Sequence, residues 1–431
     1  MDQNKSEYCS LFSIKKRTIA IIGAGPNGLL AARWALTCGL RPIIFERTGC
    51  ENTNLSAEKR EACALSSIGG AWRDNQGPCP GQMWPGMHTV SDRFTTTFFQ
   101  GFPLKASTRC DPTRVPDGAY LTCEEVREYW REVATALGLL AFVKFGHEVV
   151  AVKRLEDDRW SVSTRVNFED GTTCTTTASF DSLIIAIGAH STPCIPSFPN
   201  LSSFKGRVLH GHSFPGPAAF EGRRVLVIGG SFSGLQQTAE LVYKTTNTEV
   251  FQLVRRPCWI VPKYVTIDAR HPSARILYSK EDKSIPTVEI PFSLVTRRRS
   301  NRGIHATDGV ELRFDSPEAC KKLNTNMFKI CKDQLVSPAW TIDPNSETFY
   351  HTAVADEYPK LLAEKAPQYV ERFHLLMGEE INNFNETGVI LKSGLHIDNI
   401  DAVICCTGYK LSYDFFEDEV KSILEYEDRY S

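Results

Sequence analysis

The sequence TIAIIGAGPNG at residues 18–28 joins a short run of β-branched residues to a glycine-rich turn. The apolar residues that follow, up to Gly39, have the composition of a helix, and residues 42–45 form a second apolar run that ends at Glu46. A strand, a tight turn, a helix and a second strand in this order predict a β-α-β unit. In this context the Gly-x-Gly-x-x-Gly pattern is typical of a dinucleotide-binding turn.

Each glycine of this turn has an expected role. Gly23 forms the turn, Gly25 lets a pyrophosphate approach the backbone, and Gly28 allows close packing of the helix on the strand. Glu46 stands 18 residues after Gly28 and can accept hydrogen bonds from an adenosine ribose. Because a carboxylate at this place disfavours a 2'-phosphate, we expect the first site to bind FAD or NAD rather than NADP.

The same order of elements returns later in the chain. Residues 224–228 predict a strand, the sequence GGSFSG at residues 229–234 a glycine-rich turn, and residues 250–254 a further strand after a helix. Ser231 stands where the fingerprint has its central glycine. The turn residues that we expect at the cofactor are Gly229, Ser231, Ser233 and Gly234.

Two arginines, Arg255 and Arg256, directly follow the predicted strand at 250–254. Two guanidinium groups at this place can clamp a 2'-phosphate bidentately, which favours NADPH over NADH. The alternative is a solvated basic pair that ends the strand. Two β-α-β units in one chain imply two nucleotide sites.

The composition excludes several other classes of protein. The length of 431 residues suggests two to three domains, and 42% hydrophobic with 23% charged residues is typical of a globular protein. A net charge of -2 gives no field that would attract nucleic acid or an anionic membrane. Neither a signal peptide nor a run of 18 apolar residues is found, so we expect a cytoplasmic protein that acts on a small molecule.

The 14 cysteines include no Cys-x-x-Cys pair, which argues against a zinc module and against a flavin disulfide reductase. We interpret the adjacent Cys405 and Cys406, in an apolar run, as buried thiols rather than as a redox pair. His210 and His212 have no carboxylate near them in the sequence, so no metal site is expected.

Further motifs resemble the flavin-containing monooxygenase family, of the class B FAD- and NADPH-dependent type. The pattern Phe204-x-Gly206-x-x-x-His210-x-x-x-Phe214 resembles its identifying motif, which Baeyer–Villiger enzymes usually end in Trp. Other segments resemble further family elements: Gly69-Gly70-Ala71-Trp72 the element beside the FAD, residues 253–259 the Arg-Arg-x-x-Trp stretch, and Thr407-Gly408-Tyr409 the Ala-Thr-Gly-Tyr signature, with Cys406 in place of Ala.

The resemblance implies an α/β fold with two dinucleotide-binding, Rossmann-like lobes. We expect a larger FAD lobe at residues 1–205 and 346–431, with a smaller NADPH lobe inserted at residues 206–345. Gly70 and Trp72 would contact the FAD. Residues 312–352 have weak periodicity and are expected to be irregular.

The resemblance also implies the reaction. FAD, reduced by NADPH, would react with molecular oxygen to a C4a-(hydro)peroxyflavin, which passes one oxygen atom to nitrogen or sulfur of a small molecule. We identify no general base, in keeping with a cofactor that performs the chemistry itself. The alternatives are a Baeyer–Villiger-type monooxygenase, an uncoupled NADPH oxidase and a non-catalytic nucleotide-binding paralogue.

Two features depart from the family pattern. Counting back from Phe102-Pro103 places Ser91 where many members hold an asparagine against the flavin, and a hydroxyl has one donor instead of two. We expect a less stable oxygenated flavin and more release of hydrogen peroxide. The chain also stops 22 residues after Tyr409, earlier than usual in the family, and residues 415–430 contain no hydrophobic membrane anchor. This end is interpreted as either natural compaction or a truncated product.

Overall fold

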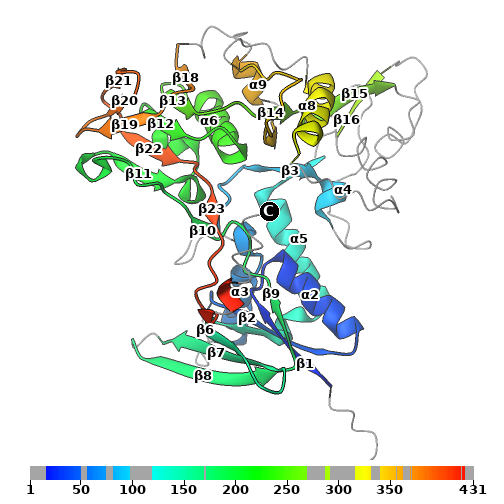
Figure 1. The fold of residues 1–431 in the computed structure, drawn as a ribbon. Coiled ribbons are helices and arrows are strands. Elements are labelled where there is room, and N and C mark those ends of the chain that lie inside the picture. Colours follow the sequence, from blue (N-terminus) through cyan, green and yellow to red (C-terminus); the bar gives the residue numbers. More distant parts are fainter. Residues whose placement is uncertain are drawn as a thin grey trace, which may run out of the picture. The chain divides into compact units, whose positions relative to one another are not determined.

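The chain folds into two compact units, each with a parallel sheet at its centre (Figure 1). The computed structural model describes residues 16–49, 56–73, 81–97, 119–168, 171–268, 287–291, 316–331, 340–355, 357–362, 369, 371–418 and 420–422. Unit 1 comprises residues 1–83, 126–192 and 409–431, and unit 2 comprises residues 84–125 and 193–408. Short strands β10 (Thr192–Pro193) and β23 (Tyr409–Lys410) lie at two of the chain crossings between the units.

Unit 1 is built around four parallel strands in the order β5-β2-β1-β9. β1 is buried from Ile19 onwards, as expected of a strand covered on both faces. α2 packs against β1 and β2, which confirms the first predicted β-α-β unit. The elements are β1 (Thr18–Ile22), α2 (Pro26–Thr37), β2 (Arg41–Glu46), α3 (Ala57–Ser67), η1 (Gly70–Trp72), α5 (Cys123–Ala136), which begins in unit 2, η2 (Leu139–Phe142), β5 (Val143–Phe145), β6 (His147–Arg154), β7 (Trp160–Asn167), β8 (Thr173–Phe180) and β9 (Ser182–Ile185).

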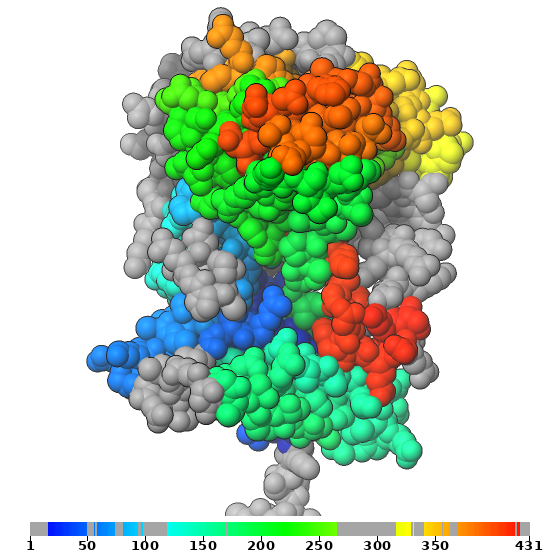
Figure 2. All heavy atoms as spheres, turned by 90° about the vertical axis from the view of Figure 1, so that its left-hand side faces the viewer, coloured from blue at the N-terminus to red at the C-terminus, as the bar shows by residue number. Residues whose placement is uncertain are grey.

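An antiparallel sheet, β6-β7-β8, packs on one face of this parallel sheet. Val152 and Val162 share a core with Ala20, Ile22 and Phe45. The outer strand β8 is exposed along most of its length and forms part of the blue-green surface in Figure 2. The hairpin strands therefore seal one face of β1 and β2.

Unit 2 is built around five parallel strands in the order β11-β22-β12-β13-β18. α6 packs against β12 and β13, which confirms the second predicted β-α-β unit. The elements are β3 (His88–Asp92), α4 (Arg93–Thr96), β4 (Tyr120–Thr122), η3 (Leu201–Ser203), β11 (Arg207–His210), η4 (Gly211–Ser213), η5 (Pro217–Phe220), β12 (Arg224–Ile228), α6 (Phe232–Lys244), β13 (Glu249–Val254), β14 (Trp259–Val261), β15 (Tyr264–Asp268), β16 (Thr287–Pro291), α8 (Pro317–Cys331), β17 (Thr352–Val354), α9 (Glu357–Leu362), β18 (Phe373–Met377), β19 (Ile381–Phe384), β20 (Val389–Leu391), β21 (His396–Ile397) and β22 (Ala402–Cys405).

The small antiparallel sheet β19-β20-β21, orange in Figure 2, covers one face of the parallel sheet of unit 2. Phe384 and Val389 pack in one core with Leu226 and Val403. Because side chains alternate along a strand, the neighbouring residues of β12 point to the opposite face. Both units thus place a helix on one face of the central strands and antiparallel strands on the other.

Strand pairing groups the chain differently from the lobes predicted at 1–205, 206–345 and 346–431. β22 lies between β11 and β12, and β18 pairs with β13. Their hydrogen bonds tie residues 371–408 to the second glycine turn. Such pairing between distant strands leaves no local pattern from which a boundary could be predicted.

The prediction that residues 312–352 are irregular is wrong in part, because α8 spans 15 of them. One side of α8 is buried at Cys320, Asn324, Met327 and Cys331, spaced by three or four residues as on one helix face. The buried Asn324 obscured this pattern. Its Oδ1 accepts from Trp259 Nε1 at 2.9 Å, and its Nδ2 donates to two backbone carbonyls.

Within the part of the chain that the structure describes, no helix combines the length and apolar character needed to cross a membrane. Most of the predicted tail at residues 415–430 lies outside the described residues, as do Phe102 and Pro103.

Candidate functional site

The first glycine turn is packed so closely that its outer glycines accept no side chain. Gly23 has a φ of +105°, and a Cβ there would lie 2.5 Å from the carbonyl oxygen of Ala186, just beyond β9. A Cβ on Gly28 would lie 1.9 Å from the Gly23 oxygen. Both distances are far below contact, so the sequence signal at these positions has a steric cause.

The Gly-Gly-Ala-Trp segment lies directly on this turn. A Cβ on Gly70 would be 3.1 Å from the Gly25 Cα, and the Gly69 amide donates to the Ala24 oxygen at 3.0 Å. Trp72 ends the short helix η1, and its carbonyl oxygen accepts from Arg127 Nε at 3.1 Å. The structure therefore brings Gly70 against Gly25, in the middle of the turn that Gly23 begins and Gly28 ends.

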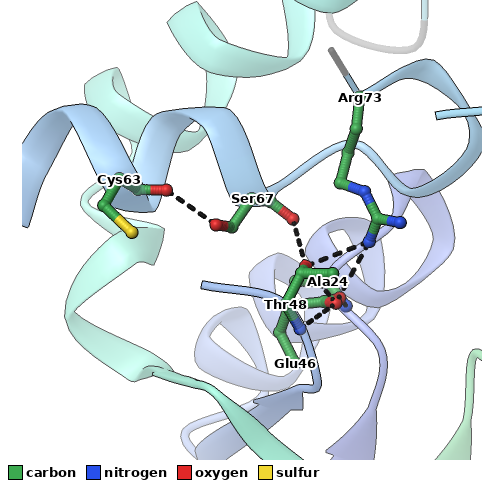
Figure 3. Close-up of polar contacts among 6 residues, drawn as sticks. All are labelled: Ala24, Glu46, Thr48, Cys63, Ser67 and Arg73. Atoms are coloured by element: carbon green, nitrogen blue, oxygen red, sulfur yellow. Dashed lines mark hydrogen bonds and ion pairs between the residues drawn. The ribbon is translucent and has the colours of Figure 1, made fainter. Parts of the chain in front are cut away.

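Glu46 is buried at the end of β2 and bonds to the turn itself (Figure 3). Its Oε2 accepts from the Ala24 amide at 2.9 Å. Its Oε1 accepts from the Thr48 amide at 3.0 Å, the Thr48 hydroxyl at 2.6 Å and Arg73 Nη1 at 3.3 Å. Thr48 and Arg73 are site residues that the sequence analysis missed. A signal was present, since Arg73 directly follows the Gly-Gly-x-Trp element.

The second glycine turn repeats the packing of the first. Gly229 has a φ of +131°, and a Cβ there would lie 2.3 Å from the carbonyl oxygen of Cys406, just beyond β22. A Cβ on Gly234 would lie 2.2 Å from the Gly229 oxygen. In both units the first glycine thus meets the residue that ends the neighbouring parallel strand.

Ser231 fits the central position of this turn because its backbone is extended, with a φ of -109° that any residue adopts. Gly230, before it, is the position without space, since a Cβ would meet Val254 Cγ1 at 2.4 Å. Ser231 and Phe232 are exposed, and Ser233 is half-buried.

Both helices that follow the turns begin without a capping side chain. The N-cap of α2 is Gly25, which has no side chain, and the N-cap of α6 is Ser231, whose hydroxyl forms no capping hydrogen bond. No acidic residue lies in the first turn of either helix. Free amides and the positive end of the helix dipole favour an anion at such a place. The donors present therefore fit two phosphate-bearing cofactors.

Arg255 and Arg256 follow β13 directly and are exposed. Among the described residues, neither guanidinium forms an ion pair. They adjoin Val254, against which Gly230 packs, so unit 2 brings the basic pair to its own glycine turn. Arg255 is near enough to Glu380 to contribute to the lowered pKa of that carboxyl, whose ion pair is with Lys392.

The motif histidine, His210, joins the end of β11 to the segment after β22. Its Nε2 donates to the Gly408 oxygen at 2.9 Å, and its Nδ1 accepts from the His212 amide at 3.0 Å. The Thr407 hydroxyl donates to the Cys194 oxygen, and the Cys194 amide donates to the Gly408 oxygen at 3.0 Å. Burial lowers the pKa of His210, against the opposing effect of its bond to Gly408.

The other motif residues are packing residues in unit 2. Phe204 lies in the core with its ring centroid 5.7 Å from that of Phe384. Gly206 leaves no space for a Cβ, which would meet Phe204 and the Asp401 oxygen. Phe214 is buried edge-to-face against Trp84. Tyr409 belongs to unit 1, where its ring packs against His190.

Cys405 is fully buried in the core, and burial raises the pKa of its thiol to about 11. Cys406 donates its S–H to Gln237 Oε1 at 3.2 Å, and Gln237 Nε2 donates to the Gly211 oxygen at 2.8 Å. The ten described cysteines are all free. No cluster of three or more potential metal ligands is found among the described residues.

Ser91 lies in β3 of unit 2, whereas the first glycine turn lies in unit 1. It is exposed, and its hydroxyl pairs with that of Thr96 at 2.9 Å. Its expected place against a flavin stays a prediction.

Comparison with known proteins gives a consistent result. A family model described as flavin-binding monooxygenase-like matches residues 66–302 and 343–428. Flavin-containing monooxygenase 5 of Oryctolagus cuniculus is 28% identical in an alignment of 417 residues. The alignment covers 94% of this chain but only 64% of that relative. S-allyl-L-cysteine S-oxygenase from Allium sativum superposes with a TM-score of 0.51 at 18% identity, over 94% of this chain and 65% of that one. An open structure of cyclohexanone monooxygenase superposes with a TM-score of 0.57 at 17% identity, over 91% and 74%. The predicted α/β fold with two dinucleotide-binding lobes is confirmed.

The environment of His210 predicts a loss of stability in mild acid. Because the pKa of His210 is lowered in the folded protein, the unfolded chain binds more protons at this residue once the pH falls below the ordinary value of about 6.5. The contribution of neutral His210 to the free energy of unfolding is therefore complete above that pH and is lost as the pH falls towards the pKa of the folded protein. The urea midpoint should fall more between about pH 7.5 and about pH 5.5 in the parent than in His210→Asn, which keeps an N–H donor. The exposed His396→Asn is the control and should follow the parent. Equal pH dependence of parent and His210→Asn would contradict the assignment.

Proposed function

Because the chain belongs to the flavin-binding monooxygenase-like family, as its motifs predicted, we propose that it is an FAD- and NADPH-dependent monooxygenase acting on nitrogen or sulfur of a small molecule. FAD and NADPH are the cofactors of this family. One observation carries the proposal. Each unit holds a strand, a closed glycine turn and an uncapped helix, followed in unit 1 by a buried carboxylate and in unit 2 by two exposed guanidinium groups.

In unit 1 the turn at residues 23–28 and the start of α2 would hold the pyrophosphate of FAD. Gly70 and Trp72 belong to the segment that lies on this turn. FAD, when bound and reduced, supplies the oxygen chemistry. The chain itself has to bind this group, orient it and keep water away from it.

Glu46 would bind the ribose of FAD through only one of its two carboxylate oxygens. Its Oε1 already accepts from three donors, while its Oε2 accepts only from Ala24. Oε2 accepts a single hydrogen bond and is therefore the oxygen with a lone pair left for a ribose hydroxyl. Arg73 Nη1 lies 3.3 Å from Oε1 and pairs with this buried carboxylate.

In unit 2 the turn at residues 229–234 and the start of α6 would hold the pyrophosphate of NADPH. Arg255 and Arg256 would bind the 2'-phosphate, a use that suits two exposed guanidinium groups beside a nucleotide turn. Ser231 and Ser233 add hydroxyl groups at the start of the helix.

Two facts support nitrogen or sulfur as the atom that is oxygenated. One structure of the same fold is an S-oxygenase, and the identifying motif ends in Phe214, as in the enzymes that oxygenate nitrogen and sulfur. Oxygen insertion beside a carbonyl is the rival, since another structure of the same fold is a cyclohexanone monooxygenase.

One experiment tests the function. The purified protein should be yellow with bound flavin, and its NADPH consumption should rise with a tertiary amine or a thioether, with formation of the N-oxide or sulfoxide. Hydrogen peroxide is measured in parallel. Lactone from a cyclic ketone would favour the rival, and complete release of peroxide with every compound would indicate an NADPH oxidase. A colourless protein that consumes no NADPH would sink the proposal.

Glu46→Gln should weaken the binding of FAD. The amide has half the acceptor capacity and no charge for Arg73, and a hydrogen bond to a charged group is worth about 1.5–3 kcal/mol, or roughly a tenfold loss of affinity or more. The measurement is the flavin to protein absorbance ratio together with a titration of apoprotein with FAD. The exposed Glu61→Gln is the matched control. Retention of FAD at parental affinity in Glu46→Gln would show that Glu46 does not hold it.

Replacement of both Arg255 and Arg256 by alanine should abolish the preference for NADPH. The loss of two charge-assisted contacts predicts a fall of roughly a hundredfold in kcat/KM for NADPH, with little change for NADH. Arg223→Ala, at the amino end of β12, removes an exposed arginine that pairs with Asp401 and should have no such effect. An unchanged ratio of NADPH to NADH in the double variant would refute the role of the pair.

A further inference from the structure

A buried glutamine holds the first carbonyl of the second glycine turn. Gln252 lies in β13 with no exposed surface, and its Nε2 donates to the Gly229 oxygen at 2.9 Å. Its neighbours in the strand are the apolar residues Phe251 and Leu253. Burial of an amide in such a place costs free energy unless the amide forms hydrogen bonds. The hydrogen bond to the turn accounts for a glutamine at this buried position.

Tyr358 of α9 fixes the orientation of this amide. Its hydroxyl donates to Gln252 Oε1 at 2.6 Å. The Gly229 oxygen can only accept, so the amide nitrogen must face the turn and Oε1 must face the tyrosine. Burial raises the pKa of Tyr358 well above its ordinary value, so the hydroxyl keeps its proton.

A buried cysteine holds the next carbonyl. The Cys258 thiol donates to the Gly230 oxygen at 3.2 Å. Burial raises the pKa of Cys258 to about 12, so the thiol is protonated and can donate. Two consecutive carbonyls of the turn are therefore held from inside the unit, by side chains that follow or belong to β13.

Held carbonyls orient the amides that a phosphate would use. In a trans peptide the C=O and the next N–H point in opposite directions, and the described residues contain no cis peptide. An inward Gly229 oxygen thus turns the Gly230 N–H outward, and an inward Gly230 oxygen does the same for Ser231. Among the described residues, the N–H groups of residues 230–233 have no acceptor. Consecutive outward amides form an anion-binding concavity.

We propose that Gln252, Tyr358 and Cys258 are positioning residues that pre-orient the amides of the NADPH turn. The proposal rests on the proposed function of this turn. It explains how a turn with Ser231 at the central position can remain ordered for a phosphate, and why Tyr358, more than a hundred residues away in sequence, belongs to the site.

The test is calorimetric titration of the flavin-loaded variants with NADP+. Removal of a neutral hydrogen bond predicts a loss of affinity of roughly three- to tenfold in Gln252→Leu and Tyr358→Phe. FAD content should stay at the parental level. Deuterium exchange at the hydrogen-bonded amides that flank the turn, those of Gly229 and Leu235, should be faster in both variants without any nucleotide, a change that a general loss of stability would not confine to these amides.

Matched variants separate positioning from packing. Tyr243→Phe removes another hydroxyl between α6 and α9, which donates to the Glu357 oxygen at 3.3 Å and does not reach the turn, so it should bind NADP+ like the parent. Cys258→Ser keeps a donor and should bind more tightly than Cys258→Ala. Should Gln252→Leu fail to fold, the tyrosine and cysteine variants decide.

Parental affinity and exchange in Tyr358→Phe and Cys258→Ala would overturn the positioning role while leaving the proposed function intact. A parent protein that binds no NADP+ would instead overturn the proposed function, and the positioning role with it.

Discussion

Both glycine turns depend on one close contact that only glycine permits. Gly23 approaches the Ala186 carbonyl, and Gly229 approaches the Cys406 carbonyl, so closely that a Cβ would overlap the oxygen. Positive φ values at both glycines add a second reason against any other residue. The contact brings the end of a distant parallel strand against the turn, and thereby decides which segments of the chain form each site.

In unit 2 the identifying motif helps to hold the Cys406 carbonyl in contact with Gly229. β22 ends at Cys405, and the residues after it are held by His210, which bonds to Gly408, and by Gln237, which bonds to Cys406. Gly211 stands where a side chain would collide with the Cys406 sulfur. The motif therefore acts through packing and backbone contacts that fix the strand beside the turn. It needs no reactive group for this task, in keeping with its small and aromatic residues.

The extent of what could be predicted follows from the range of the interactions. The two β-α-β units were predictable, and with them the positions of Glu46 at the end of β2 and of Arg255 and Arg256 directly after β13, because each lies at a fixed distance along the chain from its glycine turn. The cofactor contacts of these residues stay predictions. The membership of β22 in unit 2 was not predictable, because β22 pairs with β12, which is far away in the sequence, and such pairing leaves no local pattern. Tyr358 was missed for the same reason, since its partner Gln252 is defined only by the fold, whereas the place of Arg73 directly after the Gly-Gly-x-Trp element was a signal in the sequence. α8 was missed because the buried Asn324 reads as polar in the sequence.

The two turns differ in the charge of the group that supports them, and this difference matches the cofactors proposed for them. In unit 1 the supporting group is the carboxylate of Glu46, which accepts from a turn amide and whose negative charge would disfavour a 2'-phosphate on a nucleotide bound at this turn. In unit 2 the supporting group is the amide of Gln252, which donates to a turn carbonyl and adds no charge. The field of Arg255 and Arg256 is then unopposed from inside the turn. An acidic residue in the place of Gln252 would weaken that field at short range, where the protein screens poorly. Under the proposed function, the neutral support of Gln252 would let the basic pair select a phosphorylated nucleotide, and the charged support of Glu46 would suit an unphosphorylated ribose.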